Sequence, residues 1–169
     1  MTTKVTDFKE RITEELSDYI RCQASSLSVA DLDRLIADLP ALRERFAKIP
    51  AQTYPNLSYQ LEFLCRFVEE QVVGRDLAEE AVGEAALALL YYQRTTDLIP
   101  DSIPDMGLSD DAMIVSMVLR RQEHAFKGSS HAYMLRWPAP GFDLDELLSV
   151  ISPLRVTSFC SSLAIRPPA

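Results

Sequence analysis

The feature that most constrains this fold is a pair of almost uninterrupted apolar stretches on either side of a segment rich in aspartate and proline. The first stretch covers residues 85–92 and the second covers residues 112–119. A helix that is apolar on every side has to be buried on every side, so both stretches predict central helices. We therefore expect a buried helix pair, over about residues 77–93 and 110–126, at the centre of an all-α fold.

The segment between these helices, residues 97–111, is called the acidic segment below and predicts a chain reversal made of tight turns. Residues 97–100 and 101–104 repeat the pattern Asp-x-Ile-Pro. The residue before a proline favours an extended backbone, and a proline suits the second position of a tight turn. We expect the isoleucines to anchor the segment to the helices, and the later glycine allows backbone angles that other residues avoid. These structural positions are Ile99, Pro100, Ile103, Pro104 and Gly107.

The remaining helices are predicted by apolar residues spaced three and four apart. Such amphipathic patterns cover about residues 4–23, 32–39 and 57–72. Ser28, with an aspartate three residues later, resembles a capping box at the start of the second helix. Pro40 is expected to end or kink this helix, or to begin a new one, because proline lacks an N–H and clashes with the preceding turn.

Together these elements predict a single-domain bundle of about five to six helices over residues 4–127. A chain of 169 residues can bury a core without disulfides or metals. Residues 128–169 form a C-terminal extension that opens with glycine, serine and proline and is expected to be partly irregular. Within it, Asp143 and Glu146 are spaced to cap a short helix over residues 143–151.

Composition and charge argue against two classes of partner and against export. The net charge of −8 disfavours nucleic acid and anionic membranes, because both attract clustered Lys and Arg. No charge-free apolar run approaches the roughly 20 residues that span a bilayer, and no signal-peptide pattern opens the sequence. Cys22, Cys65 and Cys160 lie far apart and are expected to be buried, reduced thiols. We therefore expect a cytoplasmic protein without a transmembrane segment.

Five aspartates of the acidic segment are candidate metal ligands, because hard cations such as Mg²⁺ and Ca²⁺ prefer oxygen. Their spacing does not match an EF-hand loop, which needs alternating acids and a closing glutamate. Two other interpretations stay open. The carboxylates could cap helices and pair with Arg94, Arg120 or Arg121, or they could form an acidic docking surface for a basic partner. The five residues are Asp97, Asp101, Asp105, Asp110 and Asp111.

Catalytic chemistry has little support in the sequence. His124 and His131 are the only histidines, and each is expected to be exposed or satisfied within the core. Nucleophilic catalysis needs a nucleophile beside a positioned base, and the serine-hydrolase, zinc-protease and phosphate-loop motifs are absent from the sequence. Tyr91 is expected to be a buried ring under the acidic segment, with its hydroxyl bonded to an aspartate. The sequence therefore favours a non-enzymatic protein.

Two aromatic residues at the start of the C-terminal extension are candidate partner-binding residues. They are Tyr133 and Trp137, and Trp137 is followed directly by proline. If this segment is exposed it is expected to be an interaction site, because large exposed apolar groups usually contact a partner. The alternative is that this part of the chain folds back and packs on its own domain.

The acidic segment also carries a family resemblance. Residues 97–104 read Asp-Leu-Ile-Pro-Asp-x-Ile-Pro, and Gly107 and an Asp-Asp pair at residues 110–111 follow before an apolar helix. This pattern resembles the YkvA-like family of bacterial domains of unknown function, over about residues 85–120. Members of that family usually carry a proline two residues before the first aspartate, where this chain has Thr95.

The resemblance implies a small helical domain with a family-like core over residues 77–127, and it implies no activity. Our first hypothesis is a non-enzymatic interaction or scaffold protein that docks a protein partner through its acidic segment or its C-terminal extension. The alternative is a protein that binds a divalent cation, or a metal-dependent enzyme, using the aspartates of the acidic segment. Self-association into a homo-oligomer stays open under both hypotheses.

Overall fold

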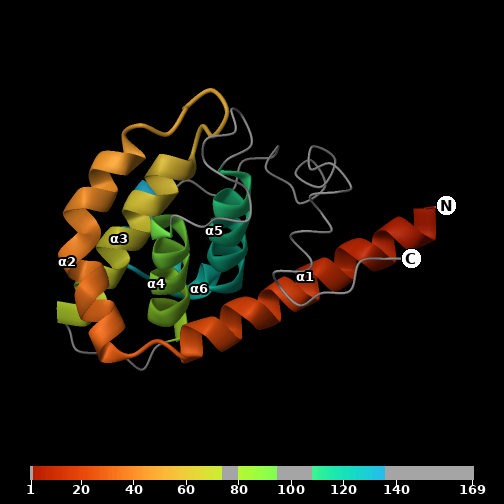
Figure 1. Ribbon diagram of the computed structural model, residues 1–169, viewed down its shortest axis with the longest axis horizontal. Coiled ribbons are helices and arrows are strands. Elements are labelled where there is room, and N and C mark those ends of the chain that lie inside the picture. Colours follow the sequence, from red (N-terminus) through yellow and green to blue (C-terminus); the bar gives the residue numbers. More distant parts are fainter. Residues whose placement is uncertain (1, 74–79, 95–107, 136–169) are drawn as a thin grey trace.

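Residues 2–73, 80–94 and 108–135 are described by the computed structural model of the chain, and every regular element within them is helical (Figure 1). The predicted all-α bundle of about five to six helices is therefore confirmed for this part of the chain. The elements are α1 (Thr2–Ser25), α2 (Val29–Phe46), α3 (Leu57–Val73), α4 (Glu80–Gln93), α5 (Ser109–Arg121), α6 (Glu123–Lys127) and the short 3₁₀ helix η1 (Ala132–Met134).

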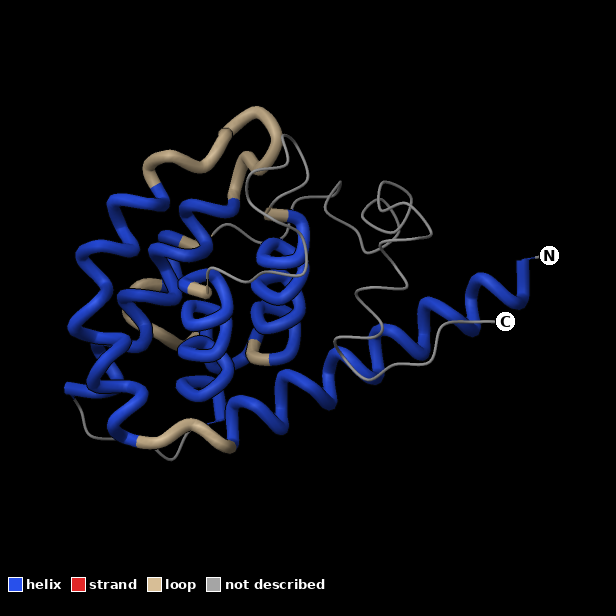
Figure 2. The backbone as a smooth tube through the Cα atoms, viewed as in Figure 1, coloured by secondary structure: helices blue, strands red, loops and turns tan. Residues whose placement is uncertain are grey.

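Helix α4 lies at the centre of the bundle and packs against α1, α2, α3 and α5 (Figure 2). Ten of its 14 residues are buried, which follows from an apolar stretch with no polar side. The neighbouring helix α5 is buried without interruption over residues 112–119. The predicted central helix pair is therefore confirmed, while the connection over residues 95–107 lies outside the described residues.

Helix α1 packs on α4 through its C-terminal half and extends beyond the bundle at its N-terminal half (Figure 1). Leu16, Ile20 and Ala24 are its buried apolar residues, spaced one turn apart. Gly83 of α4 faces Ala24, and a Cβ atom at that glycine would lie 3.3 Å from the Ala24 carbonyl oxygen. The missing side chain of Gly83 therefore allows the two helices to approach closely.

Helix α2 continues through Pro40, so the expectation that a helix ends or begins there is wrong. Pro40 lies on the exposed side, where water can bond the carbonyl that the ring leaves without a donor. Leu42 and Phe46 beyond it stay buried, and their packing holds the helix together. The predicted capping box is confirmed: Ser28 Oγ accepts the Asp31 N–H at 3.2 Å, and the Ser28 N–H donates to Asp31 Oδ2 at 2.8 Å.

Helix α5 gives way to α6 at Gln122, so the single helix predicted over residues 110–126 is wrong at its C-terminal end. Phe126 of α6 lies edge-on against the rings of Phe63 and Phe67 in α3, with centroid distances of 5.4 and 4.8 Å. Such ring pairs add to the free energy gained by burial. This contact holds α6 against α3. Helical periodicity cannot predict it, because the residues in contact are far apart in the sequence.

The cysteines differ from one another in environment. Cys65 is buried in α3, and burial raises the pKa of its thiol to about 12, so it is unreactive at neutral pH. Cys22 is exposed, so the prediction of a buried thiol is wrong for this residue. It follows Ile20 by two positions and therefore lies on the opposite side of α1. Cys160 lies outside the described residues.

The C-terminal extension is described only over residues 128–135, which form turns and the helix η1. The short helix predicted over residues 143–151 and the aromatic residue Trp137 lie outside the described residues. In the described ranges, none of the helices combines the length and the apolar character needed to cross a membrane.

Candidate functional site

Of the five candidate metal ligands, only Asp111 has a described side chain, and its exposed fraction is 1%. It lies in the first turn of α5, where the positive end of the helix dipole stabilises a carboxylate. Asp97, Asp101 and Asp105 lie outside the described residues, as does the side chain of Asp110. Within the described ranges, no three metal-binding side chains come together. The cation site therefore stays a prediction from the sequence.

Tyr91 is buried, as predicted, with an exposed fraction of 5%. It lies in the last turn of α4, the helix that precedes the acidic segment. Its expected contact with an aspartate of that segment involves residues outside the described ranges. The same holds for the other predicted structural positions, which are Ile99, Pro100, Ile103, Pro104 and Gly107.

Helix α2 fixes the end of α4 from which the acidic segment departs. The guanidinium of Arg45 lies over the ring of Tyr92, 4.7 Å from its centroid, and donates to the carbonyl oxygen of Tyr92 at 3.2 Å. It also donates to the carbonyl oxygen of Gln93 at 3.4 Å. Phe46 packs edge-on against the same Tyr92 ring. An arginine at the last carbonyls of a helix stabilises its C-terminal end.

A buried ion pair joins the two central helices. Glu84 of α4 is fully buried, and both of its carboxylate oxygens accept from Arg121 of α5 at 2.8–3.1 Å. The hydrogen bond to Glu84 raises the pKa of Arg121 above its usual value. Glu80 is a second, weaker partner at 3.5 Å. Among the described residues, the partners of Arg121 therefore come from α4, and the predicted pairing of this arginine with the acidic segment stays a prediction.

A small pocket lies between the start of α3 and the side of α5. Its polar lining residues are Tyr54, Asn56, Gln60 and Ser116. Its volume of ≈ 20 Å³ holds about one water molecule. The pocket is too small for an organic substrate or cofactor, and it carries no argument for catalysis.

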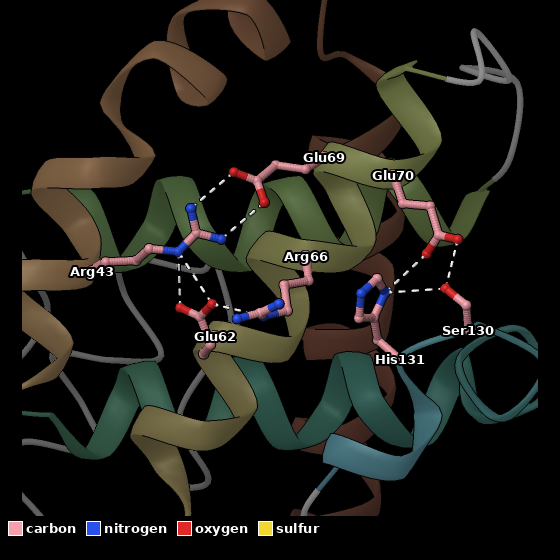
Figure 3. Close-up of polar contacts among 7 residues, drawn as sticks. All are labelled: Arg43, Glu62, Arg66, Glu69, Glu70, Ser130 and His131. Carbon is pink, nitrogen blue, oxygen red and sulfur yellow. Dashed lines mark hydrogen bonds and ion pairs between the residues drawn. The ribbon is translucent and has the colours of Figure 1, made fainter.

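A network of ion pairs crosses from α2 to α3 (Figure 3). Arg43 donates to Glu69 through both terminal nitrogens at 2.9 Å, and its Nε atom donates to Glu62 at 2.9 Å. Arg66 donates to the same Glu62 at 3.0 Å. The hydrogen bonds between Arg43 and Glu69 raise the pKa of Arg43 and hold the pKa of Glu69 below its usual value. These four charges satisfy one another, so the network tethers α2 to α3.

Beside this network, three side chains fasten the turn before η1 to helix α3, and we call them the η1 clasp (Figure 3). Ser130 Oγ donates to Glu70 Oε1 at 2.7 Å, and His131 Nδ1 lies 3.1 Å from Glu70 Oε2. Ser130 Oγ and His131 Nδ1 are 3.2 Å apart. The contacts with Ser130 and then His131 lower the pKa of Glu70.

The η1 clasp contains the residue types of a serine nucleophile with its base and acid, but not their geometry. A catalytic histidine contacts the nucleophile through one ring nitrogen and the orienting acid through the other. Here Ser130 and Glu70 both approach Nδ1 of His131. A proton taken from Ser130 would arrive at the nitrogen that faces Glu70, so the acid cannot orient the base. The arrangement fits a tether.

Tyr133, a predicted partner-binding residue, is 82% exposed on η1. The residues on both sides of it are fixed. His131 belongs to the η1 clasp, and Leu135 is buried against the core. The Met134 N–H donates to the His131 carbonyl oxygen at 2.9 Å, and the Leu135 N–H donates to that of Ala132 at 3.1 Å. A large aromatic side chain therefore projects into solvent from a well-braced turn.

Sequence reasoning could not identify Glu70 as the partner of His131, because the two residues are 61 positions apart. Helical periodicity relates only residues within a few turns of one another. The one available signal is the Gly128-Ser129-Ser130 run, a composition that predicts a change of direction after the preceding helix.

Comparison with known proteins returned no match: no family model fits the chain, and neither the curated proteins nor the solved structures include one similar to it.

Proposed function

We propose that this protein is a non-enzymatic docking protein and that Tyr133 on η1 is an anchor residue for a protein partner. The observation that carries the proposal is the 82% exposure of this tyrosine on a turn that is fastened on both sides. Tyrosine offers a large apolar ring and a hydroxyl for one hydrogen bond, and it is enriched among the residues that dominate binding energies.

The fixed turn supports the proposal through entropy. A side chain or loop that must be ordered on binding lowers the affinity, because its lost freedom opposes association. The η1 clasp and the buried side chain of Leu135 restrict the backbone around Tyr133 before any partner arrives. An anchor presented in this way loses only its own rotamer freedom when it binds.

Three further parts of the proposal rest on the sequence. The acidic segment and Trp137 are additional docking elements. Most of the acidic segment, and Trp137 itself, lie outside the described ranges. A relationship to the YkvA-like domains is supported by the Asp-x-Ile-Pro motif and by the buried helices on either side of it. A cytoplasmic location is supported by the free thiols of Cys22 and Cys65, which suit a reducing compartment.

The proposal is tested by capture with matched variants. Tyr133→Ser removes the anchor, and Tyr59→Ser is the control because Tyr59 on α3 is also a well-exposed tyrosine, at 55%. Neither change removes a buried ring, and the melting temperature of each variant is measured to confirm that it remains folded. A specific partner is then one that the original protein and Tyr59→Ser retain and Tyr133→Ser loses. If every captured protein binds all three equally, Tyr133 is not the anchor.

The alternative proposal is a divalent-cation site built from the acidic segment. Its support among the described residues is the carboxylate of Asp111, which is buried where that segment meets α5. Carboxylate oxygens are the side-chain ligands that Mg²⁺ and Ca²⁺ prefer. A helix start also favours a carboxylate without any metal, so we place docking first.

A further inference from the structure

We propose that the η1 clasp is a pH-dependent fastening, which holds η1 on α3 when His131 is protonated and loosens when the imidazole becomes neutral. The fastening is a property of the isolated protein. Its consequence, that pH regulates how firmly Tyr133 is presented, rests on the docking function proposed above.

The geometry of the η1 clasp distinguishes the two protonation states. With a protonated imidazole, Nδ1–H donates to Glu70 across 3.1 Å, and Ser130 Oγ donates to the other carboxylate oxygen at 2.7 Å. Hydrogen bonds between two charged groups are the stronger kind. When the proton on Nδ1 is lost, two lone pairs face each other across that gap, and Nδ1 competes for the Ser130 hydroxyl at 3.2 Å. With the proton on Nδ1 retained, a neutral ring keeps the hydrogen bond but loses the charge.

The charges around His131 leave Glu70 as its acidic partner. On α3, the element that η1 packs against, Glu69 is taken up by Arg43 and Glu62 is shared by Arg43 and Arg66. The hydrogen bonds from Arg43 are the main cause of the lowered pKa of Glu69, so this carboxylate is already occupied by another cation.

On α6, the helix before the turn, charge is balanced locally. Lys127 pairs with Glu123 one turn away, and His124 is exposed. The acidic field at the turn before η1 therefore comes from α3. Within the described part of the chain, His124 forms no ion pair with an acidic side chain, and it supplies a matched control histidine.

The pH range follows from the two partners. Glu70 has its pKa held below the usual value near 4.5, so its contribution is present above that value and is lost as pH falls through the lowered pKa. Imidazole side chains generally change charge between about pH 5 and pH 8, so the contribution of a protonated ring is lost as pH rises through that range. The η1 clasp is therefore expected to be tightest at about pH 5 to 6 and looser at about pH 8.

Amide hydrogen exchange of η1 tests the fastening directly. The reporters are the N–H groups of Ala132, Met134 and Leu135, which donate within the turn at 3.2, 2.9 and 3.1 Å. After correction for intrinsic exchange, their protection is expected to be higher at about pH 5.5 than at about pH 8, by up to about fivefold for a partly exposed ion pair. Amides of the buried helix α4 report global stability at both pH values.

Three variants separate the η1 clasp from a general effect of pH. Glu70→Gln and His131→Gln are expected to abolish the difference in η1 protection between the two pH values, whereas His124→Gln is expected to keep it. Equal protection of the original protein at both pH values would overturn the proposal. So would a pH difference that survives in Glu70→Gln. The exchange experiment uses the protein without a partner. Its outcome therefore tests the η1 clasp and does not depend on whether Tyr133 binds a partner.

Discussion

At the scale of single residues, the feature that sequence periodicity least explains is a buried carboxylate in the most apolar helix. Glu84 is 0% exposed, and its charge is balanced by Arg121 of α5. A buried ion pair is weak evidence for net stability, because removing both charges from water costs much of what their attraction returns. Losing one partner is different, since it leaves the other charge buried and uncompensated. The ion pair between Glu84 and Arg121 therefore specifies how α4 is aligned against α5.

We predict that Arg121→Met lowers the free energy of unfolding by about 3 kcal/mol, the lower end of the range for a broken buried pair, because 24% of the Arg121 side chain remains exposed. Urea denaturation at neutral pH measures the change. The adjacent Arg120 is exposed, and Arg120→Met is the matched control, with an expected change within about 0.5 kcal/mol. Equal losses in the two variants would show that the ion pair with Glu84 does not carry the effect.

At the scale of elements, the position of α1 depends on a glycine of α4. The Cβ that Gly83 lacks would lie 3.3 Å from a backbone oxygen of Ala24, and backbone cannot move aside as a flexible side chain can. Leu16 and Ile20 of α1 are buried in the same interface and depend on this approach. A larger residue at this position therefore has to separate the two helices.

Gly83→Leu is expected to destabilise the protein by about 2 kcal/mol, because overpacking at a close helix crossing forces backbone shifts. Gly128 offers a control, since a Cβ at that position would meet its nearest backbone oxygens at 3.6 Å, an ordinary contact distance. Chemical denaturation of Gly83→Leu and Gly128→Leu compares the two sites. The account of the crossing between α1 and α4 fails if the Gly83 variant is as stable as the Gly128 variant.

The elements also show how far the sequence predicts the fold. The apolar stretch over residues 85–92 predicts α4 correctly, because a helix without a polar side can only be buried. Pro40 misleads, since the burial of neighbouring side chains outweighs one lost hydrogen bond. The bend at Gln122 is also missed, because it depends on Phe126 packing between rings of α3. Local patterns predict which segments are helical, and long-range contacts decide where they bend.

The candidate site is less predictable than the fold. Tyr133 can be singled out from the sequence as an aromatic residue in a region of turns, but the sequence left open whether it is exposed or packed on its own domain, and the structure shows it exposed. Glu70 cannot be singled out from the sequence, because its contact with His131 forms only when the fold brings α3 beside the turn before η1. The aspartates of the acidic segment are conspicuous in the sequence, and Asp111 shows that at least one of them is buried at a helix start.

At the scale of the whole molecule, α3 of the described helical core carries two adjoining polar clusters, the ion pairs with α2 and the η1 clasp (Figure 3). The ion pairs with α2 satisfy one another, and the only aromatic side chain on η1 points outward. The small pocket beside α5 has room for about one water molecule.

A thermal melt distinguishes docking from cation binding in the whole molecule. We predict the same melting temperature in EDTA and in excess Mg²⁺ or Ca²⁺. A cation bound only by the folded state at a hundred times its dissociation constant would add about 2.7 kcal/mol, which raises the melting temperature by several degrees. A rise specific to one cation, and lost in Asp101→Asn and Asp105→Asn, would favour the cation site instead.

The central claim is that Tyr133 anchors a partner, and the most direct test is the affinity of the captured partner in purified form. Calorimetry with the original protein, Tyr59→Ser and Tyr133→Ser gives three dissociation constants under one set of conditions. We predict that Tyr133→Ser weakens binding at least about tenfold, as for a residue that dominates an interface, and that Tyr59→Ser leaves the affinity unchanged. Equal affinities for all three proteins would contradict the claim and move the search for the docking surface away from η1.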